Sequence, residues 1–116
     1  MYSNDYLYIV AKINNKIVGF IDGIFEGAGL FWLSWIGVDQ DFRGNSIGTK
    51  LLKFLEKYLK NKTNVHKVWC CIEPQNAESI SLFVKNKYIN VAFLEKHWYG
   101  IDTYLWQKII TEKKVV

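Results

Sequence analysis

Residues 30–52 read LFWLSWIGVDQDFRGNSIGTKLL and combine a predicted strand, a loop and the start of a helix. The run Leu30–Val38 is almost wholly apolar, which is typical of a strand buried on both faces. From position 47 the apolar residues follow the period of an amphipathic helix, with one side formed by Ile47, Leu51, Leu52, Leu55 and Leu59. The stretch therefore predicts a central strand that leads into a helix through a short loop.

That loop, residues 39–49, has the composition of an anion-binding turn. Backbone N–H groups at the start of a helix point outward at the positive end of the helix dipole. Arg43 adds a planar cationic fork, and Gly44 and Gly48 allow close approach of the backbone. A plainer interpretation stays open, in which Gly44 only makes a turn and Arg43 is a solvated charge.

The flanking segments predict a mixed α/β sheet. Residues 6–13 and 17–25 are rich in β-branched and aromatic side chains and are separated by turn residues, so we expect a hairpin. The remaining predicted elements are strands at 66–72, 89–96 and 100–109, and a helix after Pro74 with an apolar side of Ile80, Phe83, Val84 and Tyr88. The order is β-β-β-α-β-α-β-β, which we assign to a single domain over residues 1–116.

Composition narrows the classes of protein. Half of the residues are hydrophobic and 22% are charged, which excludes a disordered chain. Because no apolar run reaches about 18 residues and the first residues lack the layout of a signal peptide, we expect a cytoplasmic protein without a membrane partner. The net charge of +4 favours a phosphorylated ligand. Acidic residues interrupt the lysines of the first helix and of Lys113 and Lys114, so we do not expect a nucleic-acid partner.

Neither disulfide nor metal chemistry is indicated. Cys70 and Cys71 are adjacent and point to opposite faces of a strand, so we interpret them as small apolar fillers. His66 and His97 lack the spacing of zinc ligands. We therefore expect no metal cofactor.

Two motifs stand at fixed places in this order of elements. The first is Val38 followed by Arg43-Gly44-Asn45-Ser46-Ile47-Gly48, and the second runs from Ile72 through Asn76, Leu82 and Lys85 to Tyr88. Together they resemble the GNAT N-acetyltransferase family, whose patterns are Arg/Gln-x-x-Gly-x-Gly/Ala and Val-x-x-x-Asn-x-x-Ala-x-x-Leu-Tyr-x-Lys-x-Gly-Phe. The departures from these patterns are Ser46, Ser79, Phe83, Lys87 and Tyr88. The resemblance covers most of the chain and implies a GNAT-like fold.

The resemblance also implies a site for acetyl-coenzyme A. The loop amides would hold the pyrophosphate, and the main chain of Ile36 and Val38 would pair with the pantetheine arm. Asn76 would orient that arm, or it is simply the N-cap of the following helix. The residues expected at the cofactor are Ile36, Val38, Arg43, Gly44, Asn45, Ser46, Ile47, Gly48, Thr49, Asn76, Ser79 and Phe83.

The implied reaction moves the acetyl group directly to a primary amine of a small molecule or peptide within a ternary complex. Phe83 occupies the position of the family's usual general-acid tyrosine. The predicted central strand offers only Ser34 as a base, and we expect the nearby acids Glu26, Asp22 and Glu73 to be solvated charges. Ser34 and Glu26 remain weak catalytic candidates. A second hypothesis is therefore a family member that binds acetyl-coenzyme A but catalyses weakly or not at all.

Two expectations concern surfaces. The aromatic residues either line an acceptor pocket or, as we favour, belong to the core; they are Phe31, Trp32, Trp35, Trp98 and Tyr99. The first predicted strand corresponds to the family's second strand, which implies that part of the usual acceptor wall is absent. The open sheet edge that results predicts a homodimer.

Overall fold

The computed structural model describes residues 5–112, so Lys113 and Lys114 lie outside the described part of the chain. The predicted order of strands and helices is confirmed, with a short 3-10 turn added after the third strand. In chain order the elements are β1 (Tyr6–Ile13), β2 (Lys16–Gly27), β3 (Leu30–Val38), η2 (Gln40–Phe42), α1 (Ile47–Lys62), β4 (Lys67–Ile72), α2 (Ala77–Lys85), β5 (Ile89–Trp98) and β6 (Ile101–Ile109).

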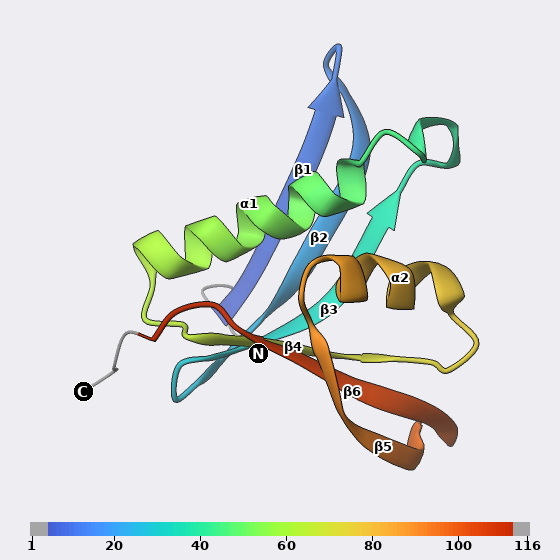
Figure 1. The fold of residues 1–116 in the computed structure, drawn as a ribbon. Coiled ribbons are helices and arrows are strands. Elements are labelled where there is room, and N and C mark those ends of the chain that lie inside the picture. Colours follow the sequence, from blue (N-terminus) through green and yellow to red (C-terminus); the bar gives the residue numbers. More distant parts are fainter. Residues whose placement is uncertain (1–4, 113–116) are drawn as a thin grey trace.

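The strands form one mixed sheet in the order β1-β2-β3-β4-β6-β5. β3 and β4 are parallel and are connected through α1, whereas the other neighbouring pairs are antiparallel. β3 and β4 pair only between Leu30–Trp32 and Lys67–Trp69. Beyond these residues the two strands separate, and an opening forms in the middle of the sheet (Figure 1).

The core lies between the sheet and the two helices, which Figure 1 shows on the same side of the sheet. The apolar side predicted for α1 is confirmed, because its five residues are all buried: Ile47, Leu51, Leu52, Leu55 and Leu59. Each fully buried leucine contributes about 1.5–3 kcal/mol to folding. α1 contacts β1, β2 and β3, so it fixes the half of the sheet that ends in the 39–49 loop.

The prediction that β3 is buried on both faces is wrong. Phe31 and Leu33 are buried under the helices, whereas Trp35 is 61% exposed. The helices cover one face of the sheet, and the apolar run of β3 continues on the other, which we call the free face (Figure 1). Phe31 is a core residue as predicted, but Trp98 and Tyr99 are 45% and 90% exposed, so the core interpretation fails for them.

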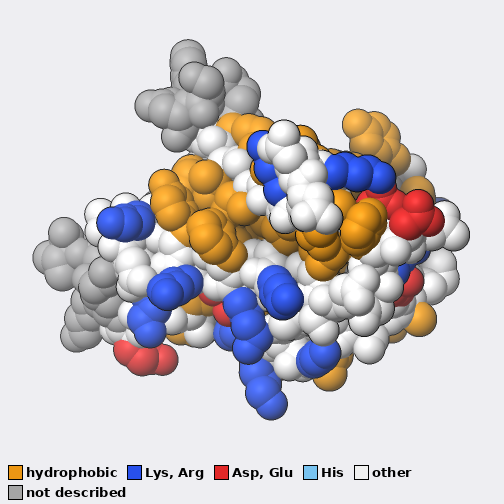
Figure 2. Space-filling model, turned by 90° about the horizontal axis from the view of Figure 1, so that it is seen from above, with side chains coloured by type: hydrophobic (Ala, Val, Ile, Leu, Met, Phe, Trp, Pro, Cys, Tyr) orange, Lys and Arg blue, Asp and Glu red, His pale blue; other side chains and the backbone are white. Residues whose placement is uncertain are grey.

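Several large apolar side chains of the protein are exposed to solvent. Figure 2 shows hydrophobic side chains open to solvent beside a group of Lys and Arg side chains. Lys50, Lys53 and Lys57 on α1 are exposed, as expected for the polar side of that helix. Val84, which the helical spacing placed on the apolar side of α2, is 53% exposed. The sequence pattern therefore overestimated how much of the apolar surface is buried.

The second helix also ends earlier than its apolar spacing suggested. α2 stops at Lys85, and the chain reverses through Lys87, whose φ is 73°. The N–H of Tyr88 then donates to the carbonyl of Phe83 at 2.9 Å, and the two rings make an edge contact at 4.9 Å between centroids. Tyr88 is buried as predicted, although it lies in the turn and not in the helix.

Candidate functional site

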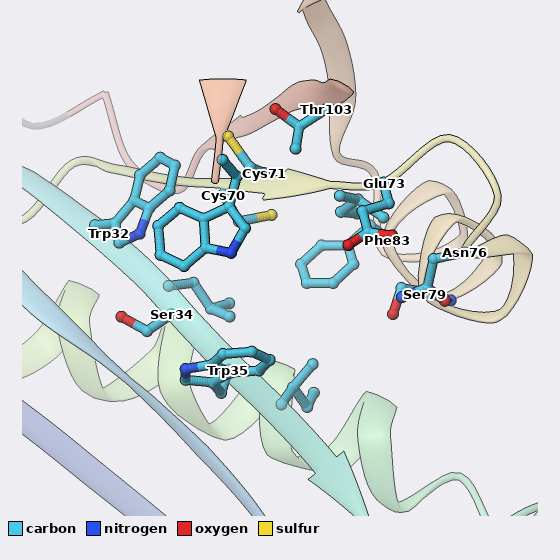
Figure 3. A pocket seen from close by; sticks show the side chains of 14 residues that line it. Trp32, Ser34, Trp35, Cys70, Cys71, Glu73, Asn76, Ser79, Phe83 and Thr103 are labelled. Atoms are coloured by element: carbon cyan, nitrogen blue, oxygen red, sulfur yellow. The ribbon is translucent and has the colours of Figure 1, made fainter. Parts of the chain in front are cut away.

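The opening between β3 and β4 is a cavity of about 370 Å³. Residues of β3, β4, α2 and β6 surround it, and Figure 3 shows Trp32, Ser34 and Trp35 on one wall and Asn76, Ser79 and Phe83 on another. A bulge at Ser34 accompanies the separation of the strands, because Asp22 pairs with Trp35 while Gly23 pairs with Leu33. Bulges bend a strand and redirect its side chains. The bulge thus turns β3 away from β4 at the cavity.

The main chain of β3 is open on the cavity side. The N–H of Asp39 donates to the carbonyl of Val18 in β2 at 2.7 Å. Hydrogen-bonding groups of successive residues in a strand alternate between its two sides. Val38 and Ile36 therefore direct their N–H and C=O groups toward the opening, as an extended ligand with amide groups would require.

The loop that follows β3 is held by local hydrogen bonds. The N–H of Asp41 donates to Asp39 Oδ1 at 2.9 Å, and Asn45 Nδ2 donates to the carbonyl of Phe42 at 3.2 Å. The loop then passes through the left-handed region at Gly44 and Ser46, with φ values of 86° and 61°. The second value shows that Ser46 adopts a conformation that favours glycine, the residue usual in the resembling motif.

The N-terminus of α1 is free of the side-chain contacts that normally cap a helix. Ser46 makes no capping hydrogen bond, and the first turn contains no acid. The first intrahelical bond runs from the N–H of Lys50 to the carbonyl of Ser46 at 3.0 Å. The N–H groups of Ile47, Gly48 and Thr49 therefore have no partner within the helix and are available to an anion.

A second hollow of about 480 Å³ lies over this helix end and adjoins the first, since Ile36 and Ser79 line both. Its charged lining residues are Arg43, Lys85 and Glu78. Arg43 Nε donates to the carbonyl of Val38 at 3.3 Å, and Nη1 lies 3.7 Å from Glu78 Oε1. Both side chains are largely exposed, so this ion pair contributes at most about 1 kcal/mol and Arg43 is free to turn toward a phosphate.

Asn76 and Phe83 form part of the α2 side of the cavity. Asn76 Oδ1 accepts a hydrogen bond from the N–H of Ser79 at 3.2 Å, so Asn76 is the N-cap of α2, and its side chain also lines the cavity. Phe83 is 2% exposed and lines the same cavity (Figure 3). The ring of Phe83 carries no proton that it could give to a leaving group.

Among the weak catalytic candidates, Ser34 lines the cavity and Glu26 does not. Glu26 Oε1 instead accepts a hydrogen bond from Trp69 Nε1 at 2.5 Å. Glu73 lines the cavity, and its Oε2 accepts from Gln75 Nε2 at 2.7 Å. The expectation of a solvated charge is wrong for Asp22, because this residue is only 6% exposed. Its in-register neighbours on β1 and β3 are Tyr8 and Trp35.

The structure adds lining residues that were not among those expected at the cofactor. Cys71 and Thr103 line the cavity from β4 and β6, and Lys85 and Glu78 line the second hollow from α2. Burial raises the pKa of Cys71 and raises that of Cys70 to about 12, so both thiols remain protonated near neutral pH. Cys70 is buried as predicted and Cys71 is half-buried, and both border the cavity. Cys71 and Thr103 reach the cavity because β4 and β6 pair, and no local sequence pattern indicates this placement.

Within residues 5–112, no group of three or more His, Cys, Asp or Glu side chains is arranged to hold a metal ion. In the same range, neither helix is long and apolar enough to cross a membrane.

Comparison with known proteins identifies relatives of this arrangement. Residues 1–88 match the acetyltransferase (GNAT) family. The chain is 33% identical over 86 residues to an acetyltransferase of Pectobacterium atrosepticum, covering 73% of this chain and 59% of that protein. It is 30% identical over 98 residues to an uncharacterized N-acetyltransferase of Methanocaldococcus jannaschii, covering 84% of this chain and 61% of that protein. The chain thus spans about three fifths of the length of these relatives.

Among solved structures, the ribosomal-protein-S18-alanine N-acetyltransferase of Escherichia coli superimposes with a TM-score of 0.85 at 20% identity, covering 97% of this chain and 74% of that chain. This likeness shows that the two proteins share a fold.

Proposed function

Because this chain belongs to the GNAT family of acetyltransferases, we propose that it transfers an acetyl group from acetyl-coenzyme A to a primary amine of a small molecule or peptide. The transfer is direct and takes place in a ternary complex. One observation carries the proposal: the strand opening between β3 and β4 leads without interruption to the uncapped N-terminus of α1. An extended ligand with a phosphorylated end and an amide-bearing arm fits both places.

The phosphate end of the ligand is held by charge and by backbone N–H groups. Gly44, Ser46, Ile47, Gly48 and Thr49 line the second hollow, which we call the phosphate hollow, and Arg43 and Lys85 supply two cations. Arg43 pairs with phosphate oxygens in a planar, two-pronged geometry, whereas Lys85 acts as a point charge. The polyanionic end of acetyl-coenzyme A is therefore the end that we assign to this hollow.

The arm of the ligand lies along β3. The main-chain groups of Ile36 and Val38 hold its amides as a neighbouring strand would, and Asn76 and Ser79 contact it from α2. When bound, acetyl-coenzyme A supplies an acetyl thioester at the end of this arm. The cavity between β3, β4 and α2 encloses that end, so the protein mainly positions the two reactants.

Proton transfer sets the demands on the side chains. An aliphatic amine with a pKa near 10.4 must lose a proton before it attacks, and the N–H of Val38 is placed to stabilise negative charge on the carbonyl oxygen. Glu73 is the cavity-lining acid and Ser34 the hydroxyl on β3. Since Phe83 has no hydroxyl, water supplies the proton to the departing thiolate.

A second candidate function follows from the same position. A buried phenylalanine at residue 83 leaves the site without the acid that would speed release of the thiol. The protein would then bind acetyl-coenzyme A with weak or no catalysis and act as a sensor.

Calorimetric titration with acetyl-coenzyme A, followed by thiol release with a panel of amines, separates these functions. Binding with turnover supports the transferase, and binding without turnover supports the sensor. Absence of binding would contradict both. The matched variants are Arg43→Ala, which we expect to weaken binding at least tenfold, and Glu95→Gln, an exposed change on β5 that should leave it unaltered.

We also propose that the protein is a homodimer. The sequence pointed to the edge at the first strand, β1; we place the dimer contact instead at the opposite outer strand, β5, because its Ile89, Val91 and Phe93 are 58%, 43% and 53% exposed. Two copies of one strand edge can pair antiparallel about a two-fold axis, which removes both edges from solvent. Light scattering at micromolar concentration should give twice the monomer mass, and Phe93→Lys should reduce it. A monomeric mass for the unaltered protein would contradict this assembly.

A further inference from the structure

A buried carboxylate lies on the free face beside the cavity. Asp22 on β2 stands in register with Tyr8 of β1 and Trp35 of β3, so the three side chains share one face of the sheet. Asp22 is 6% exposed. The hydroxyl of Tyr6 donates a hydrogen bond to Asp22 Oδ2, while Oδ1 is buried and has no hydrogen-bond partner among the described residues.

This carboxylate lacks the partners that buried acids normally have. Among residues 5–112, Arg43 pairs with Glu78 and Lys108 pairs with Glu56, so neither of these ion pairs involves Asp22. Buried carboxylate oxygens without a partner are costly and are rare in folded proteins. The hydrogen bond to Asp22 raises the pKa of Tyr6 to about 12. Asp22 Oδ1 thus lacks a hydrogen bond that the N–H group of a ligand could supply once it reaches this oxygen.

Partly exposed aromatic residues on β1 and β3 neighbour Asp22 on the free face. Tyr6, Tyr8 and Trp35 are 39%, 55% and 61% exposed, and the rings of Tyr6 and Tyr8 lie 6.4 Å apart. A carboxylate flanked by the faces of tyrosine and tryptophan is suited to an organic ammonium ion, which aromatic rings attract through their quadrupole. Trp35 also lines the cavity between β3 and β4, as Figure 3 shows, so one side chain borders both places.

We infer that Asp22, with Tyr8 and Trp35, binds a second cationic group of the amine acceptor. The inference rests on the proposed function. Asp22 lies one strand away from β3, and the acetyl end lies in the opening on the other side of β3. Two strand spacings are about 10 Å. The acceptor class is therefore an amine with another positive charge about 10 Å from the reacting nitrogen, either in a diamine or in a peptide with a basic side chain.

The approach to Asp22 is from the free face. Tyr8 and Trp35, the in-register neighbours of Asp22, are largely solvent-exposed, and exposed side chains change rotamer within nanoseconds, so we expect these rings to move aside and admit a ligand to Oδ1. The reacting amine then enters the cavity past the ring of Trp35. In this arrangement Asp22 selects the acceptor by charge and takes no part in bond formation.

The test compares two probes of equal length, diaminooctane and octylamine, which differ by one charge. In the unaltered protein we expect a kcat/KM at least tenfold higher for diaminooctane. Asp22→Asn should lower the value for diaminooctane about ten- to a hundredfold and change that for octylamine less than twofold. Tyr8→Leu, at an exposed position outside the cavity, should reduce the preference about two- to fivefold. Glu95→Gln is the matched control for a lost acid, and thermal melts check that each variant folds.

The outcomes separate the acceptor subsite from the proposed reaction. Equal turnover of the two probes by the unaltered protein, or an equal loss for both in Asp22→Asn, would overturn the subsite while leaving acetyl transfer intact. If neither probe is acetylated, Trp fluorescence titration with diaminooctane decides: binding that Asp22→Asn abolishes supports the subsite without the reaction, and unchanged binding overturns it. A short peptide with a lysine three residues from its amino terminus, assayed beside diaminooctane, shows which source supplies the second charge.

Discussion

Replacing Glu78 by glutamine should tighten the binding of acetyl-coenzyme A. Glu78 is the acidic residue that lines the phosphate hollow, and its Oε1 lies 3.7 Å from Arg43 Nη1. A phosphate oxygen bonded to the other side of that guanidinium at about 2.8 Å would lie about 7 Å from the carboxylate. At this distance in water two unit charges repel by about 0.6 kcal/mol, so the two charges of a pyrophosphate give about 1 kcal/mol. The dissociation constant should therefore fall about fivefold.

Calorimetric titration at two ionic strengths tests this reasoning. At about 0.15 M salt the screening length is about 8 Å, so the gain in affinity of Glu78→Gln should shrink to about twofold. Glu95→Gln removes the same charge from β5 and should leave the affinity unchanged at both salt concentrations. Weaker binding by Glu78→Gln would refute the argument, because it would mean that Glu78 aligns Arg43 for the phosphate. A gain that does not depend on salt would refute its electrostatic origin.

Three more predictions concern the site and its surroundings. Phe83→Tyr should raise kcat at least tenfold with little change in cofactor affinity, because it adds a proton donor to the cavity wall. Single-turnover kinetics would show this rise. A lower rate in a variant that melts at the normal temperature would contradict the prediction. Ser46→Gly removes about 1 kcal/mol of left-handed strain but raises the conformational entropy of the unfolded chain by about as much, so the free energy of unfolding in urea should change by less than about 0.5 kcal/mol. Ser46→Val should instead weaken cofactor binding at least tenfold. Equal affinities of the two variants for the cofactor would show that φ at this position is unimportant. Burial raises the pKa of Cys70 from 9.0 to about 12, so the thiol of the unfolded chain loses its proton at lower pH than the thiol of the folded chain. The free energy of unfolding should therefore fall by about 1.4 kcal/mol per pH unit as pH rises above 9. Urea titrations of Cys70→Ala should lack this part of the decline.

Local pattern was enough to predict the elements and the loop, because each depends on neighbours in sequence. The buried side of α1, from Ile47 to Leu59, follows directly from helical spacing, and the order of strands and helices follows from turns and apolar runs. For the run Leu30–Val38 the prediction of burial on both faces is wrong for a physical reason. Its apolar residues do not say which faces helices cover, and Trp35 is exposed because both described helices pack on the other face.

The chemistry that sequence reasoning missed depends on register between strands. Asp22 looked like a solvated charge, but it is buried in the sheet, in register with Tyr8 and Trp35 on two different strands. Thr103 reaches the cavity because β6 lies beside β4, although about thirty residues of chain separate the two strands. A one-residue change of register would move each of these side chains to the other face. No local motif encodes such a placement.

The two helix N-termini show how the protein divides stability from binding. α2 begins with Asn76, which caps it, whereas α1 begins with a left-handed serine that makes no cap and has no acid in its first turn. A missing cap costs a helix about 1 kcal/mol, and unpaired main-chain groups on β3 add to that cost. Both defects face the same pair of adjoining hollows, so one ligand can satisfy them together. We therefore expect acetyl-coenzyme A to stabilise the fold, by about 2.7 kcal/mol at a hundredfold excess over its dissociation constant.

Capping α1 with Ser46→Asp should act in the opposite way: it would supply the missing acid to the empty helix end and repel the phosphates. A variant that melts higher alone but gains less from the ligand would show that the uncapped helix end is kept for binding.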